Sequence, residues 1–154
     1  MQTHTLHRTQ SGWGDAAVDG LLSGVAAGLL MAGFLTSAGL IGGQSWEGVL
    51  RQFDPGAMPA PLAGAVTHLA VSGVYGILFA SLWRPLTRLW GRLPGWLAGL
   101  VFGCLLWLLA ATVTAARAAS GAQWLQAIPP AQLAIAHLLF GLALGWLVSR
   151  RQNH

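Results

Sequence analysis

Charged side chains are scarce in this sequence. Only 8% of the 154 residues are charged, there is no lysine, and the four acids are Asp15, Asp19, Glu47 and Asp54. Soluble domains average about 25% charged residues, and disordered chains combine high charge with low hydrophobicity. Because 55% of this chain is hydrophobic, it fits neither class.

Recognisable catalytic patterns are also lacking. The single cysteine, Cys104, lies within an apolar run, so there is no intramolecular disulfide and no paired-cysteine metal or redox motif. There is no glycine-rich phosphate loop and no acid inside an apolar run that could couple to protons. The sequence therefore assigns no catalytic residue and favours a protein that is not an enzyme.

What the chain does have is four long apolar runs without a charged residue in their interior. A helix that crosses a bilayer needs about 20 apolar residues, and in lipid its backbone must satisfy its own hydrogen bonds. The sequence therefore predicts an all-α membrane protein, a bundle of four transmembrane helices over roughly Gly20–Leu40, Pro61–Trp83, Gly95–Ala116 and Pro130–Ser149.

The arginines predict the orientation. Six of the eight fall on one side of the predicted membrane, namely Arg8, Arg84, Arg88, Arg92, Arg150 and Arg151, and the other side has Arg51 and Arg117. Positive residues stay in the cytoplasm, so both termini are expected there, in a bacterial inner membrane. Read this way, the basic charge is a topology signal and predicts no nucleic-acid partner. The tryptophans agree, because indoles favour the interface: Trp83, Trp90, Trp96 and Trp146 fall on the inner side, and Trp46 and Trp124 on the outer side.

Two halves of the sequence resemble each other. Gly20, Gly24 and Gly28 align with Gly95, Gly99 and Gly103, and in the second span of each half Pro61 and His68 align with Pro130 and His137. We interpret this as a tandem duplication of a two-helix unit. The predicted organisation is a cytoplasmic tail (1–19), a first repeat (20–83), a basic cytoplasmic loop (84–94), a second repeat (95–149) and a C-terminal tail (150–154).

Glycines recur at every fourth position and form helix-packing stripes. A stripe of small residues lets two helix backbones approach closely in a membrane. Most of these glycines fall in the cytoplasmic half, so we expect a bundle that is tight there and opens outward as a cup. The stripes comprise Gly20, Gly24, Gly28, Gly95, Gly99, Gly103, Gly141 and Gly145.

His68 and His137 are the candidate site. Each lies seven residues after the proline that starts its helix, about 10 Å below the outer end. Ser72 and Tyr75 share a helix face with His68. Hydroxyls of the other spans at the outer half complete the predicted lining of the cup: Thr36, Ser37, Thr112 and Thr114.

Several interpretations of the two imidazoles stay open. Each could hydrogen-bond a neighbouring helix and hold the bundle together. Haem b or a chlorin could be ligated axially by one or both, with the iron as the metal. Two histidines fill only half of a zinc shell, so a bare ion is less favoured. Proton or substrate handling is the remaining alternative. His4, His7 and His154 are expected to be solvated tail residues.

The segments "AHLLFGLALG" and "THLAVSGVYG" resemble a helix of small uncharacterised four-span bacterial membrane proteins, with the form A-H-L-x-(F/Y)-G-x-x-x-G. Ser72 departs from this form, since Gly141 stands at its equivalent. The resemblance implies the four-helix fold. We expect a non-catalytic subunit of a larger complex, in respiratory or photosynthetic electron transport, with lipid and other membrane subunits or a second copy as partners. A haem- or pigment-binding electron carrier and a small transporter or channel are the alternatives.

Overall fold

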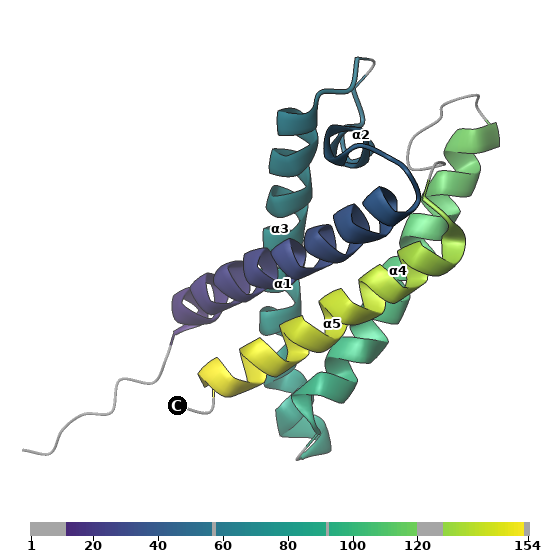
Figure 1. The fold of residues 1–154 in the computed structure, drawn as a ribbon. Coiled ribbons are helices and arrows are strands. Elements are labelled where there is room, and N and C mark those ends of the chain that lie inside the picture. The colour runs from purple at the N-terminus through teal and green to yellow at the C-terminus, as the bar shows by residue number, and fades with distance from the viewer. Residues whose placement is uncertain (1–11, 57, 92, 120–127, 153–154) are drawn as a thin grey trace, which may run out of the picture.

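The computed structural model describes residues 12–56, 58–91, 93–119 and 128–152 (Figure 1). All regular elements within these ranges are helices. Four of them are long and apolar enough to cross a membrane, which confirms the predicted all-α membrane fold. The helices are α1 (Trp13–Ile41), α2 (Trp46–Arg51), α3 (Pro61–Trp90), α4 (Gly95–Ala119) and α5 (Pro130–Gln152).

The sequence predicts where three spans begin but not where α1 begins or α3 ends. α1 starts seven residues before Gly20, because the Gly12 N–H donates to the Asp15 carboxylate at 2.8 Å and satisfies the first turn. α3 continues through Pro85 to Trp90, so most of the predicted loop at 84–94 is helical. Arg84 and Arg88 therefore extend from a helix, and Arg92 lies outside the described residues.

α1 and α3 pack through glycine. A Cβ added at Gly20 would lie 2.6 Å from the carbonyl oxygen of Gly76, and one at Gly24 would lie 2.9 Å from the Gly76 Cα. Gly28 faces Ser72, and a Cβ added at Gly28 would lie 2.6 Å from the Ser72 Cβ. At Gly20 and Gly24 the two backbones therefore touch directly, while at Gly28 the small Ser72 side chain fills the contact.

α4 and α5 pack in the same manner. A Cβ at Gly99 would lie 2.9 Å from the Cα of Gly145, and one at Gly141 would lie 2.8 Å from the Cα of Gly103. These positions are the ones that the sequence repeat aligns with the α1–α3 contact. The duplication itself remains an inference from the sequence.

The two pairs are joined through α1 and α5, which run side by side (Figure 1). Ser23 of α1 is fully buried, and its hydroxyl has no hydrogen-bond partner within the described part of the chain. Asp19 and Arg151 add an ion pair of 3.7 Å where α1 begins and α5 ends, an exposed contact of small energetic weight. The helices contribute apolar core residues that include Ala16, Ala27, Met31 and Leu35 from α1, and Ala136, Phe140, Leu144 and Val148 from α5.

We call the end of the bundle with the start of α1 and the end of α5 the terminal end, and the opposite end the α2 end. The short helix α2 was not predicted. The Ser45 hydroxyl caps it by accepting from the Gly48 N–H at 3.1 Å. Val49 and Phe53 are buried. Because Gly64 of α3 has no side chain, the backbone of Leu50 can pack directly against α3. α2 therefore lies flat against α1 and α3.

One tryptophan expected at the interface belongs to the core. Trp83 is only 5% exposed and stacks on Phe79 with ring centroids 6.0 Å apart. Trp46, Trp96 and Trp146 are about half exposed, as residues at a lipid or water boundary should be. The Trp90 side chain and Trp124 lie outside the described residues.

The glycine contacts predict a position-specific loss of stability. Gly24→Leu should destabilise the bundle by about 1–3 kcal/mol, because a side chain there must push α3 away. Gly33→Leu is the matched control, since it lies on the same helix and a Cβ there meets nothing within 4 Å. Thermal unfolding in detergent measures both variants. Equal midpoints would contradict the close contact.

Candidate functional site

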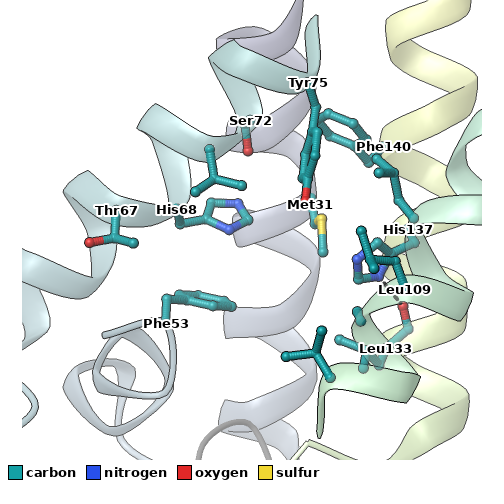
Figure 2. Close-up of a pocket in the computed structure, with 14 residues that line it drawn as sticks. Met31, Phe53, Thr67, His68, Ser72, Tyr75, Leu109, Leu133, His137 and Phe140 are labelled. Carbon is teal, nitrogen blue, oxygen red and sulfur yellow. Dashed lines mark hydrogen bonds between the residues drawn. The ribbon is translucent and has the colours of Figure 1, made fainter. Parts of the chain in front are cut away.

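A cavity of about 240 Å³ lies between the helices in the half toward the α2 end. α1 forms its back wall, α3 lies on one side, and α4 and α5 lie on the other (Figure 2). Both candidate histidines line it, so the structure brings together the four residues predicted as a site. We call it the histidine cavity; its lining is Met31, Phe53, Thr67, His68, Val71, Ser72, Tyr75, Leu106, Leu109, Ala110, Val113, Leu133, His137 and Phe140.

His68 connects two helices. Its Nε2–H donates to the carbonyl oxygen of Gly28 on α1, at 3.0 Å. A carbonyl only accepts, so Nε2 must carry the proton, and in the neutral imidazole Nδ1 is then an acceptor. The ring also packs on Phe53, with centroids 4.6 Å apart and planes tilted by 32°. The expected role of a histidine that bonds a neighbouring helix fits His68.

His137 bonds its own helix instead. Its Nδ1–H donates to the Leu133 carbonyl at 2.8 Å, one turn earlier in α5 (Figure 2). The expectation that each imidazole bonds a neighbouring helix is therefore wrong for His137. The neutral ring keeps Nε2 as an acceptor, and no hydrogen bond to this nitrogen occurs within the described residues. Both imidazoles line the same cavity.

Ser72 and Tyr75 occupy different parts of the cavity wall. Ser72 is 4% exposed and fills the contact with Gly28. Tyr75 extends between the two imidazoles (Figure 2) and meets Phe102 of α4 edge to face, with centroids 6.5 Å apart. Phe102 in turn lies 5.3 Å from the Phe79 ring. These aromatic rings close the cavity toward the terminal end.

The predicted hydroxyl-lined cup is wrong in two respects. Thr36, Ser37, Thr112 and Thr114 do not line the cavity. Three of these hydroxyls bond carbonyls of their own helices, Ser37 to Gly33, Thr112 to Leu109 and Thr114 to Ala110, each at 2.8 Å. In addition, Phe53 lies over His68 from the α2 side, so the cavity does not open freely at that end.

Sequence reasoning missed most of the apolar lining. Phe140 lies three residues after His137 and therefore on the same helix face, so its position was predictable. Met31 and Phe53 reach the cavity through the packing of α1 and α2, which no local pattern reveals. Thr67 is a further hydroxyl residue that the sequence interpretation did not include.

Asp54 holds the segment that carries Phe53. Its carboxylate accepts the N–H groups of Ala60 and Gly56, each at 2.9 Å. The bond from Ala60, and then that from Gly56, holds the pKa of the Asp54 carboxyl below its ordinary 3.8, because both bonds favour the charged form. The carboxyl is therefore ionised at neutral pH, and its two hydrogen bonds tie Asp54 to Gly56 and Ala60.

The histidine cavity offers two imidazole acceptors, the three hydroxyl residues Thr67, Ser72 and Tyr75, and otherwise apolar walls. Within the part of the chain that the structure describes, no group of three or more histidine, cysteine or acidic side chains could hold a metal ion. Either free imidazole nitrogen has the chemistry of an axial haem ligand. However, a volume of about 240 Å³ falls below the roughly 300–1,000 Å³ of pockets for drug-sized ligands. A tetrapyrrole does not fit the cavity as it stands.

The remaining candidates lie elsewhere. Cys104 of α4 is a free, partly buried thiol. His4, His7 and His154 lie outside the described residues, as do Arg8, Trp124 and most of the predicted loop around 120–128.

The different bonds of the two histidines predict different effects on stability. His68→Ala should destabilise the protein by about 0.6–2 kcal/mol, because it removes a bond between helices. His137→Ala should cost less, because α5 retains its own backbone bonds. Thermal unfolding in detergent measures both, and His68→Gln, whose amide can donate to Gly28, should recover part of the loss. A larger effect at His137 would refute the assignment.

Comparisons with known proteins place the chain in a family without assigning its role. No curated protein matches it, and no solved structure does. The family match covers residues 15–154, and so all four spans. This chain belongs to DUF6789, a family of unknown function.

Proposed function

We propose that this chain is a non-catalytic subunit of a larger membrane complex and that it holds a small lipophilic molecule in the histidine cavity. The observation that carries the proposal is the cavity itself. Two imidazoles, each with one nitrogen free of protein hydrogen bonds in the described residues, line an apolar space inside a membrane-spanning bundle. A few polar groups in a mostly apolar pocket are typical of a ligand site.

The outer surface of the bundle supports the role as a subunit. α4 is the most apolar of the four spans and the least buried. Its exposed side chains include Leu97, Val101, Leu105 and Leu108. Such a surface suits contact with lipid or with helices of other subunits. Imidazoles beside a ring-sized space suit a small molecule that carries electrons. We therefore propose that the larger complex is a bacterial respiratory or photosynthetic one.

The experiment is purification from native membranes in mild detergent, followed by mass spectrometry of co-eluting chains and of extracted small molecules. Ala110→Leu fills the cavity from α4, and Ala115→Leu makes the same change at an exposed position of that helix. We expect the same small molecule to be extracted with the wild type and with Ala115→Leu. Its affinity for Ala110→Leu should be about tenfold lower or more, a loss of at least ~1.4 kcal/mol of binding free energy. A wild type without a bound molecule would refute the ligand role, and one without reproducible co-eluting chains would refute the subunit role.

Haem or pigment binding is a second candidate, favoured by the two free imidazole nitrogens on one cavity. It requires α3 and α4 to separate, because the cavity is too small. If a haem is held, the purified protein should show a Soret band that His68→Ala or His137→Ala shifts or abolishes, since axial ligands control the iron spectrum. A preparation that stays colourless after reconstitution with haem would eliminate this candidate.

Transport is less well supported. Toward the terminal end, direct glycine contacts within each helix pair and the rings of Tyr75, Phe79 and Phe102 fill the space between the helices. A transporter needs a polar path through both leaflets.

We also propose that both termini are cytoplasmic, because six of the eight arginines fall on that side. The Asp19–Arg151 ion pair supports a topology in which the start of α1 and the end of α5 lie on the same side of the membrane. A reporter that works only in the cytoplasm should be active when it is fused after Arg151. A reporter that works only in the periplasm should be active when it is inserted after Gly56, in the segment between α2 and α3. The reverse pattern would overturn the orientation.

A further inference from the structure

We propose that the histidine cavity recognises a single aromatic ring with a hydroxyl group at each end, a lipid-soluble hydroquinone-type molecule. This inference rests on the proposed ligand role and names the chemical class of the ligand. It follows from the size of the cavity, the placement of its acceptors and the way it meets the membrane.

The size admits one ring. A cavity of 150 Å³ in another protein binds benzene, and this one measures about 240 Å³. The difference leaves room for small substituents but not for a fused ring system of tetrapyrrole size. Phe53, Tyr75 and Phe140 line the space, and Met31 lies at its back (Figure 2). Aromatic faces and a thioether are favourable partners for an aromatic ring.

The polar groups select hydroxyl donors. His68 uses Nε2 and His137 uses Nδ1 to donate to backbone carbonyls, so each neutral ring presents an acceptor, Nδ1 and Nε2 respectively. The two residues lie on opposite sides of the cavity (Figure 2). A ligand with a donor at both ends satisfies both acceptors, whereas a ligand without donors leaves them unpaired in an apolar site, which is unfavourable.

The lining also selects against charge. It contains no acid, lysine or arginine, so neither an ammonium ion nor a carboxylate would find a counter-ion. Burial of an unpaired charge is costly. A neutral polyol would satisfy the acceptors but not the apolar walls. The neutral aromatic diol matches both.

Access to the cavity is from the bilayer. Val71 of α3 and Leu109 of α4 both line the cavity, yet they are 44% and 49% exposed. Their outer surfaces lie on the part of the bundle that meets lipid, while Phe53 covers the α2 side. The opening between α3 and α4 therefore admits a molecule dissolved in the membrane and leaves room for an apolar tail outside.

The test uses three probes that carry two, one and no hydroxyl donors, each blocked hydroxyl also adding a methyl group: hydroquinone, 4-methoxyphenol and 1,4-dimethoxybenzene. Binding to the detergent-solubilised full chain is measured by calorimetry or ligand-observed NMR, with Ala110→Leu as the blank for partition into micelles. Each blocked hydroxyl should weaken binding by about two- to tenfold, because each removes one hydrogen bond to an imidazole. Ala115→Leu should bind all three like the wild type.

His137→Leu assigns one acceptor. With only His68 left, hydroquinone and 4-methoxyphenol should bind within about twofold of each other, because a single hydrogen bond remains for either. His137→Gln, which restores an acceptor oxygen, should recover the difference. A purely structural effect of the substitution would weaken all three probes alike.

The outcomes separate this inference from the proposed function. The inference is supported by the graded series if its first step, from hydroquinone to 4-methoxyphenol, is lost in His137→Leu and recovered in His137→Gln. Equal binding of all three probes that Ala110→Leu abolishes would overturn the hydroxyl class and leave the ligand role standing. If no probe binds above the Ala110→Leu blank, the hydroxyl class is also overturned. The ligand role is then decided by the molecules that are extracted with the native protein.

Discussion

Direct backbone contact at glycine is the constraint on which the rest of this structure depends. In lipid, helices gain little from burying apolar side chains, so close packing and hydrogen bonds must hold them together. Here Gly24 meets Gly76, and Gly99 meets Gly145. These contacts bind α1 to α3 and α4 to α5. Because they hold each pair so closely, the two pairs can meet along α1 and α5 while α3 and α4 remain apart.

The cavity is a consequence of that arrangement. Toward the terminal end, the gap between α3 and α4 is filled by Tyr75, Phe79 and Phe102. Farther toward the α2 end, Val71 of α3 and Ala110 of α4 line the cavity that lies between these helices. The same spacing that glycine imposes on each pair thus leaves room for a ligand between the pairs, beside both imidazoles.

The two histidines, which a sequence alignment of the halves pairs with each other, have different chemistry in the structure. His68 lies beside Gly28, so its ring can reach a carbonyl of another helix. His137 turns back on its own helix. One imidazole therefore contributes to the assembly of the bundle, while the other is supported locally and can be altered with less effect on the fold. The segment after α2 adds a further asymmetry, because Phe53, held by the Asp54 turn, covers one imidazole and not the other.

The sequence by itself determined the four spans, the starts of three of them at Pro61, Gly95 and Pro130, and the glycine positions at which backbones touch. These features depend on local composition and on helical periodicity, which are readable along one chain. Tertiary structure decided which imidazole nitrogen is free, that Thr112 and Thr114 bond their own helix and not the cavity, and that Phe53 covers His68. Those outcomes depend on which surfaces meet across the bundle. No spacing within a single helix encodes that choice. The His68–Gly28 bond and the Phe53–His68 contact join different elements. Thr112, Thr114 and His137 bond their own helices at positions where the packing of the described residues brings no other acceptor to them.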